Sequence, residues 1–286
     1  MPVAIDHRMI KTNGVTLHVA QAGAEDAPLV ILLHGYPEFW YGWRKQIDYL
    51  AAQGYRVWAP DQRGYNLSEK PAGINAYRVS NLVDDVLGLL DAAGVESAYL
   101  VGHDWGAGVA WAAALAHPER FKKLVIMNVP HPKVFADTLR SNPGQMLKSW
   151  YFGFFQIPLL PEALLSLGDY RGMVRALISS GTPRTFSDAD IREYVTAWKQ
   201  PGAMTAMINW YRAAVQHTPK VPDDPRIHIP TLVIWGAQDI ALTREMAQQS
   251  VNWCDDGRLV MFEQATHWVH HDETEGVNTL LSDFLR

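Results

Sequence analysis

Gly102-His103-Asp104-Trp105-Gly106 places two glycines around a central residue that could act as a nucleophile. This spacing is typical of a nucleophile elbow, a sharp turn from a strand into a helix in which glycines let the backbone and the helix approach closely. The central residue here is Asp104, whereas a serine is usual at this position. The elbow therefore points to reactions that a carboxylate can begin.

An aspartate nucleophile suits different targets from a serine because it is already ionised at neutral pH, with an unperturbed pKa of about 3.9. It can displace a leaving group from an sp3 carbon, and the resulting alkyl ester stays hydrolysable at the carbonyl of Asp104 itself. A serine would form an ether, which water does not readily cleave. The alternative is that Asp104 only caps the following helix, which is a commoner use of aspartate. The two glycines and the strand-to-helix context favour opening of an epoxide or a carbon–halogen bond.

Two further residues complete a candidate triad. Asp239 lies just beyond an apolar strand run in which strand character begins at Thr231, and His267 follows the strand predicted over 259–262. The chain order of nucleophile, acid and histidine, each beyond a strand, is that of the α/β-hydrolase triad. Because His267 must be neutral to act as a base, we expect ester hydrolysis to slow as pH falls through about 6.5, unless Asp239 raises the pKa of His267.

Other residues compete for these two positions. The strand before the one that precedes Asp239 is followed by Asn128, which is not an acid, so Asp239 is preferred. His270 and His271 lie close behind His267, but they would already belong to the closing segment of the chain. The loop position directly after the strand therefore favours His267 as the base.

Hydrolysis of an ester on Asp104 would create an oxyanion that needs backbone N–H donors. The expected donors are the amides of Tyr36, after the buried strand at 29–33, and of Trp105, the residue after the nucleophile. His34 is expected to hold the loop rather than contact substrate. A histidine and glycine after a strand could also be simple turn residues.

Together these motifs resemble the epoxide hydrolase branch of the α/β-hydrolases. The matching segments are 34–44, 61–71, the elbow, and the loops that contain Asp239 and His267. They span nearly the whole chain, and the aspartate at the elbow restricts the resemblance to epoxide hydrolases and dehalogenases. The resemblance implies an enzyme that adds water to an epoxide and releases a vicinal diol.

The resemblance also implies two tyrosines that bind and protonate the epoxide oxygen. Tyr151, within the aromatic segment 149–158, and Tyr211, within 209–212, stand at the matching places. A phenol with a pKa near 10 is protonated at neutral pH and can donate a hydrogen bond and then a proton. Aromatic clusters of this kind more often serve packing than catalysis, so the role of the two tyrosines is a hypothesis.

Two alternatives stay open. A haloalkane or haloacid dehalogenase would use the same triad, and Trp105 would suit a halide site. Position 36 is a tyrosine, however, where many haloalkane dehalogenases present an asparagine to the halide. A non-catalytic ligand receptor on the same fold is the other alternative, and it is disfavoured because no catalytic residue is missing.

The alternation of strands and helices predicts an α/β-hydrolase fold, a mostly parallel sheet flanked by helices, with a helical cap insertion. A helix after the elbow should end near His117, and another, capped by Ser80, should end near Gly94. Residues 1–132 and 226–286 are expected to form the core domain and residues 133–225 the cap domain, which closes with a proline-rich link over 219–225. Strands are predicted at 15–20, 29–33, 55–59, 98–101, 123–127 and 259–262, and a seventh strand is expected to begin at Thr231.

The composition is that of an ordinary enzyme. The net charge is −5 and there is no basic run, so neither nucleic acid nor a membrane surface is an expected partner. Cys254 is the only cysteine, and His270 and His271 are adjacent rather than at ligand spacing, so no metal and no cofactor is expected. The expected partner is a small lipophilic epoxide, and a homodimer is left open. Residues 1–8 lack a secretory signal and no apolar segment reaches about 18 residues, so a cytoplasmic location is expected.

Overall fold

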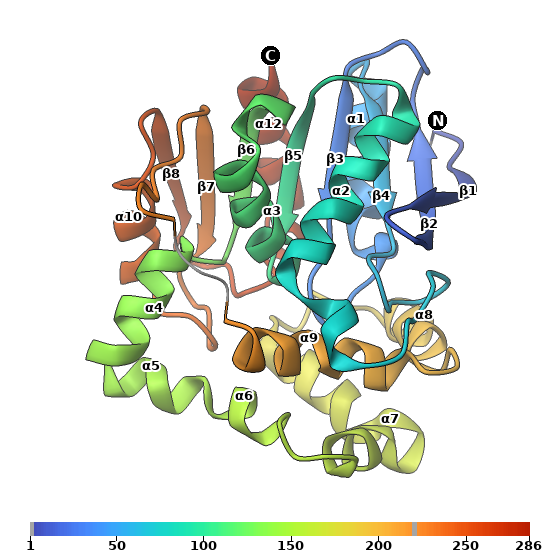
Figure 1. Ribbon diagram of the computed structural model, residues 1–286, viewed down its shortest axis with the longest axis vertical. Coiled ribbons are helices and arrows are strands. Elements are labelled where there is room, and N and C mark those ends of the chain that lie inside the picture. The colour runs from blue at the N-terminus through green and yellow to red at the C-terminus, as the bar shows by residue number, and fades with distance from the viewer. Residues whose placement is uncertain (1–2, 219–221) are drawn as a thin grey trace.

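The computed structural model describes residues 3–218 and 222–286, which contain one eight-stranded sheet (Figure 1). Along the sheet the strands follow the order β1-β2-β4-β3-β5-β6-β7-β8. β1 and β2 pair in antiparallel fashion, as do β2 and β4, and the remaining neighbours are parallel. The prediction of a mostly parallel sheet is confirmed. In chain order the strands are β1 (Asp6–Thr12), β2 (Val15–Ala22), β3 (Leu29–Leu33), β4 (Arg56–Pro60), β5 (Ala98–His103), β6 (Phe121–Met127), β7 (Thr231–Gly236) and β8 (Gly257–Phe262).

The central strands form where the sequence has short apolar runs. Every residue of β3 and of β7 is buried, as expected for parallel strands that are covered on both faces. The six strands that were predicted with both bounds agree with the observed ones to within two residues at each end, and β7 begins at Thr231, as expected. The pattern of apolar runs in the sequence did not predict β1, whose residues are mostly exposed at the edge of the sheet. An edge strand buries little apolar surface, so it leaves a weak hydrophobic signal.

Helices cover both faces of the sheet. α1 (Arg44–Ala52) and α12 (Thr274–Leu285) pack against each other on one face, and α2 (Val79–Ala93) and α3 (Trp105–Ala116) lie together on the other (Figure 1). Ser80 was expected to cap α2, but the helix begins one residue earlier, at Val79, and has no side-chain cap. Gly94 ends α2 in the left-handed conformation that glycine favours. Two short helices, α10 (Glu245–Val251) and α11 (Val269–Asp272), complete the C-terminal part.

Between β6 and β7 the chain forms only helices within the described residues 128–218. They lie together beneath the sheet in Figure 1, and the first of them, α4 (Pro132–Ser141), contacts α10 and α3. Residues 219–221 of the predicted proline-rich link, and residues 1–2 of the predicted amino-terminal segment, lie outside the described residues. The exact boundary between core and cap stays a prediction. The helices are α4 (Pro132–Ser141), α5 (Pro143–Lys148), α6 (Trp150–Phe154), α7 (Leu160–Ser180), α8 (Asp188–Trp198) and α9 (Ala203–Gln216).

Buried aromatic side chains attach these helices to the sheet domain. The indole of Trp198 in α8 donates to the Pro37 carbonyl over 2.7 Å, and that of Trp210 in α9 donates to the Arg63 carbonyl over 2.9 Å. Both indoles are almost completely buried. A buried aromatic ring with a satisfied N–H group combines a large apolar contact with a directional bond. These contacts therefore fix α8 and α9 over the loops that follow β3 and β4.

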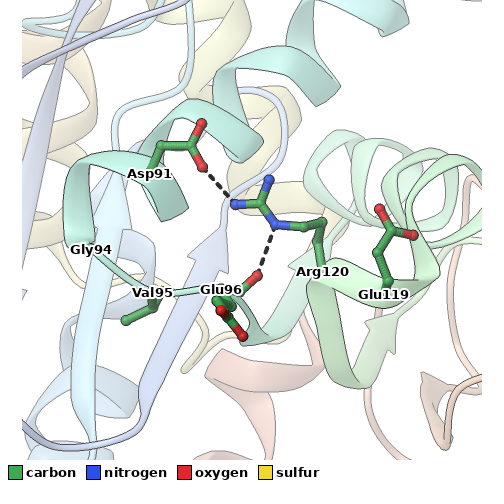
Figure 2. Close-up of a pocket in the computed structure, with 6 residues that line it drawn as sticks. All are labelled: Asp91, Gly94, Val95, Glu96, Glu119 and Arg120. Atoms are coloured by element: carbon green, nitrogen blue, oxygen red, sulfur yellow. Dashed lines mark hydrogen bonds and ion pairs between the residues drawn. The ribbon is translucent and has the colours of Figure 1, made fainter.

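A surface depression lies at the other end of the sheet. Figure 2 shows its lining, in which Arg120 donates to the carboxylate of Asp91 over 2.6 Å and to the carbonyl of Glu96 over 2.8 Å. These residues precede β5 and β6, so the depression faces the amino ends of the strands, away from Asp104. Among the described residues, the structure has no helix that is long and apolar enough to cross a membrane.

Candidate active site

Asp104 occupies a strained turn between β5 and α3. Its φ of 48° and ψ of −125° place a non-glycine residue at positive φ, which costs about 1–3 kcal/mol and is typical of functional turns. The flanking glycines have no room for a side chain. A Cβ atom on Gly106 would overlap the carbonyl of Leu33, and one on Gly102 would lie 2.5 Å from the carbonyl oxygen of Gly106. The strand, the turn and the helix therefore fit together only with glycine at both positions.

The three predicted triad residues meet at this turn. Nδ1 of His267 lies 2.7 Å from Oδ2 of Asp239, and Nε2 of the same ring lies 3.4 Å from Oδ2 of Asp104. Asp239 and His267 are buried, and 20% of the Asp104 side chain is exposed. One imidazole thus faces a carboxylate through each of its nitrogens, which is the geometry of a base that a second carboxylate orients.

Asp239 is held by several donors besides His267. Its Oδ1 accepts hydrogen bonds from the backbone amides of Ala241 and Leu242 over 2.7 and 3.0 Å. Its Oδ2 accepts from Nδ2 of Asn128 over 2.7 Å, and Oδ1 of Asn128 in turn accepts from the Gly236 amide. Asn128 was considered only as an unsuitable acid, but the structure makes it a partner of the acid. Its place after β6, beside the strand that precedes Asp239, is the signal that could have identified it.

The carboxylates and the imidazole shift each other's pKa. Burial opposes ionisation of both Asp104 and Asp239, but the charge and hydrogen bonds of His267 outweigh it, so both carboxyl groups have a lowered pKa. Burial also opposes protonation of His267, and the two carboxylates more than offset it, so the pKa of His267 lies well above 6.5. The resting site therefore favours two carboxylates around an imidazolium.

The amide of Tyr36 donates to Oδ1 of Asp104 over 2.7 Å. It therefore already contacts the oxygen that would carry negative charge in a tetrahedral intermediate. Within the part of the chain that the structure describes, the Trp105 amide makes no hydrogen bond to this carboxylate, so its oxyanion role stays a prediction. His34 holds the loop, as expected: its Nδ1 lies 2.9 Å from the Gly35 carbonyl, and its Nε2 accepts from the Gln62 amide over 3.0 Å.

Tyr151 of α6 and Tyr211 of α9 lie next to each other. Their ring centroids are 5.7 Å apart, and the ring of Tyr211 lies 5.0 Å from Trp105 and 5.3 Å from Tyr36. Burial raises the pKa of both phenols, and the negative charge of Asp104 raises it further. The structure thus brings the two predicted tyrosines together near the nucleophile and keeps them protonated.

Comparison with known proteins agrees with this arrangement. A family model described as alpha/beta hydrolase fold matches residues 28–274. The chain is 46% identical to the AB hydrolase superfamily protein YfhM of Bacillus subtilis, over 98% of this chain and 97% of that protein. It is 36% identical to epoxide hydrolase 4 of Mus musculus, over 97% of this chain and 78% of that protein. This chain belongs to the epoxide hydrolases of the α/β-hydrolase fold.

Solved structures support the same assignment. An epoxide hydrolase from Bacillus megaterium, in complex with an inhibitor, is 31% identical and superposes with a TM-score of 0.90, covering 97% of this chain and 99% of that one. Epoxide hydrolase A from Mycobacterium thermoresistibile is also 31% identical, with a TM-score of 0.85 and coverage of 99% and 98%. The resemblance that the motifs indicated is therefore confirmed for the family and for the fold.

Behind the nucleophile, this epoxide hydrolase has a sealed polar cluster that the motifs did not predict. Glu38 accepts from the Tyr194 hydroxyl over 2.6 Å, and its Oε1 lies 2.7 Å from Nε2 of His271. Its Oε2 lies 3.3 Å from Nε2 of His270 and 3.4 Å from Nδ1 of His103. Burial raises the pKa of Glu38, but the charges of His271 and His270 more than offset this, so its pKa is lowered well below the usual range.

His270 and His271 are adjacent in the sequence, which is not a ligand spacing, but both rings face Glu38. Their ring nitrogens and a Glu38 oxygen all lie within 4.8 Å of one another, a spacing that could hold a metal ion. All three residues are buried, and Glu38 already accepts hydrogen bonds from Tyr194 and His271. Oε1 of Glu38 is thus satisfied, whereas its Oε2 and both ring nitrogens of His270 have no hydrogen-bond partner in the described part of the chain. The cluster packs behind His103, the residue before the nucleophile.

Proposed function

We propose that this enzyme converts an epoxide and water into a vicinal diol through a covalent ester on Asp104. The observation that supports this most directly is the aspartate at the elbow, with His267 facing one carboxylate oxygen and the Tyr36 amide facing the other. This pair of contacts leaves an ionised nucleophile with a base and an oxyanion donor already beside it. It suits the formation and then the cleavage of an alkyl ester.

In the first step, Asp104 attacks one epoxide carbon while the carbon–oxygen bond on its far side breaks. The leaving oxygen stays attached to the other carbon and takes a proton from Tyr151 or Tyr211. The close approach of the two phenols supports this role, because both can hydrogen-bond to one oxygen atom. Their raised pKa values keep them protonated until the oxygen becomes basic. The product of this step is a hydroxyalkyl ester of Asp104.

In the second step, His267 removes a proton from water, which attacks the ester carbonyl of Asp104. Before this, the imidazolium of the resting site gives up its proton, which restores the tyrosine that protonated the epoxide oxygen. Ester formation has neutralised one of the two carboxylates that raised the pKa of His267, so this proton leaves more readily at this stage. Asp239 keeps Nδ1 oriented, which leaves Nε2 to face the water. The amides of Tyr36 and Trp105 stabilise the oxyanion. When it collapses, the departing alkoxide takes the proton from His267 and leaves as the diol, and the carboxylic acid formed on Asp104 returns its proton to His267.

A His267→Gln variant tests the covalent step. It should form the ester but hydrolyse it slowly, so mixing it with a panel of epoxides should add the mass of one substrate molecule to the intact protein. Peptide mapping should place the added mass on Asp104. The double variant Asp104→Asn/His267→Gln is the control and should gain no mass.

The outcome separates the competing functions. Halide release from haloalkanes or haloacids, with no turnover of any epoxide, would favour a dehalogenase. A wild-type protein that binds epoxides without turning any of them over would favour a ligand receptor. An adduct on a residue other than Asp104 would contradict the mechanism.

The expected partner is a small lipophilic epoxide in the cytoplasm, with no nucleic acid and no membrane surface involved. The net charge of −5 and the aromatic side chains around Asp104, including Trp105 and Tyr211, support this part of the proposal. Cell fractionation with a tagged full-length chain tests the location, and recovery of the enzyme in a membrane or secreted fraction would contradict it. Light scattering of the purified enzyme would decide whether it forms a homodimer.

A further inference from the structure

Three consecutive residues of α9 point in three directions. In an α-helix successive side chains are about 100° apart, so Trp210, Tyr211 and Arg212 cannot share one face. Trp210 bonds to the Arg63 carbonyl of the core, and Tyr211 packs against Trp105 beside the nucleophile. Arg212 faces the connection between α6 and α7. The helix therefore fixes one catalytic tyrosine relative to the core and presents Arg212 to the segment that carries the other.

Arg212 makes an unusually complete set of bonds for a cap residue. Its Nε donates to the Phe155 carbonyl and its Nη2 to the Ile157 carbonyl, each over 2.9 Å. The two terminal nitrogens also pair with the carboxylate of Glu162, over 2.6 and 3.1 Å, and Nη1 donates to Oδ1 of Asn209 over 3.3 Å. Only 8% of the side chain is exposed. A planar guanidinium with several fixed donors suits this task better than a lysine would.

The contact with Phe155 leads directly to Tyr151. The amide of Phe155 donates to the Tyr151 carbonyl over 2.9 Å, while its carbonyl accepts from Arg212. A second contact runs the other way, since Nε2 of Gln156 donates to the Tyr211 carbonyl over 3.3 Å. The backbone segments that carry the two tyrosines are therefore joined through the backbone of Phe155 and the guanidinium group of Arg212.

α6 depends on such contacts for its position. It has five residues and no side-chain cap, and isolated helices of this length are not stable in water. Phe155, just after it, is buried against the ring of Tyr211 at a centroid distance of 4.8 Å. Neither the helix itself nor a cap therefore holds Tyr151 in place.

We propose that Arg212 is a positioning residue that sets the separation of Tyr151 and Tyr211, so that both hydroxyls reach one epoxide oxygen. This inference rests on the proposed function, in which the two phenols act during ester formation. Arg212 itself does not touch the nucleophile, His267 or Asp239 in the structure. Its loss should therefore slow ester formation and leave ester hydrolysis nearly unchanged.

The test is an Arg212→Lys variant, studied by rapid quenching and intact mass measurement with an epoxide that the wild-type enzyme turns over. A displacement of about 1 Å in a reacting geometry costs on the order of 100-fold in rate, so we expect ester formation to slow by about 10- to 100-fold. Ester hydrolysis, followed after the ester has formed, should change by less than about twofold. Equal slowing of both steps, or no slowing in a folded variant, would overturn the proposal.

Arg44→Lys is the matched control, because Arg44 also pairs with a cap carboxylate, Asp190, over 2.7 Å and donates to a carbonyl, that of Tyr41. It should leave the ratio of the two rates unchanged. If Arg212→Lys does not fold, the pair Arg212→Met/Glu162→Leu removes both buried charges and leaves no carboxylate unpaired. This pair should slow ester formation selectively, and equal slowing of the two steps in it would again refute the proposal.

Tyrosine variants separate this inference from the proposed function. If Tyr151→Phe and Tyr211→Phe leave ester formation unchanged, the function proposed for the phenols fails. If they slow it and Arg212→Lys does not, only the positioning role fails. In a background with both tyrosines replaced by phenylalanine, Arg212→Lys should slow ester formation no further, because a positioning residue has no effect once the groups it positions are gone.

Discussion

The side-chain amide of Asn128 donates to Oδ2 of Asp239 over 2.7 Å, and this is the same oxygen that faces Nδ1 of His267. The Asp239 carboxylate therefore cannot turn away from the imidazole without breaking a second bond. A hydrogen bond to a charged group contributes about 1.5–3 kcal/mol. Asn128 thus limits the orientations that Asp239, and through it His267, can adopt.

Replacing Asn128 by alanine should slow hydrolysis of the Asp104 ester more than its formation. If the whole free energy of the lost hydrogen bond is added to the activation barrier, the rate of ester hydrolysis should decrease by about 10- to 100-fold. Single-turnover kinetics with a limiting amount of epoxide would measure both steps. A variant that slows only ester formation would show that Asn128 does not act through the base.

The pKa of His267 should fall when the charge of Asp104 is removed. Two carboxylates raise this pKa in the resting enzyme, and Asp104→Asn leaves only the one from Asp239. Since the amide resembles the neutral ester, the variant mimics the site before hydrolysis. NMR titration of labelled histidine would give both values, and an unchanged or higher pKa in Asp104→Asn would contradict the charge coupling.

Ester formation should not decline as pH rises towards 10. Burial and the charge of Asp104 raise the pKa of Tyr151 and Tyr211 above 10, so both phenols keep their protons over this range. Removal of one hydroxyl, in Tyr151→Phe or Tyr211→Phe, should slow this step by about 100-fold, the lower end of the range for general acid catalysis. Stopped-flow measurements between pH 7 and 10 would check both points. A rate of ester formation that falls with the titration of an unperturbed phenol would contradict the role proposed for Tyr151 and Tyr211.

Glu38→Gln should lower the free energy of unfolding by about 3 kcal/mol or more at neutral pH, because it removes the carboxylate that the buried Tyr194 hydroxyl and His271 ring contact. The pKa of Glu38 is lowered in the folded state, so its contribution is present above the unfolded value of about 4.3 and is lost as pH falls through the folded one. The difference between the variant and the wild type should therefore narrow in acid. Urea unfolding at a series of pH values measures it, and a constant difference would contradict the assignment.

The order of elements and the place of the triad could be predicted from the sequence because both depend on local patterns. Apolar runs located seven of the eight strands, and Asp104, Asp239 and His267 each follow one of them. Parallel strands direct their carboxyl ends to one edge, so these side chains had to converge. No apolar run marks the exposed strand β1, and no capping side chain marks the start of α2.

Contacts between residues far apart in the chain could not be predicted in this way. Arg212 bonds to a carboxylate 50 positions away, and Glu38 contacts His271 across 233 positions. Neither pair shares a periodic pattern or a motif, since each depends on how separate helices and loops pack. The placement of Tyr151 and Tyr211 was predictable only through the resemblance to a family, because the aromatic residues around them look the same as ordinary packing.

The helices α4–α9 enter the chain between β6 and β7, whereas Asp104, Asp239 and His267 all lie on loops of the sheet domain. In the proposed mechanism, the hydrolytic machinery and the tyrosines that protonate the epoxide oxygen would thus come from two separate stretches of the chain. A chimaera that exchanges residues 133–225 for the corresponding stretch of a relative should acquire that relative's stereochemical preference. It would keep its own rate of diol release wherever breakdown of the alkylated carboxylate limits turnover.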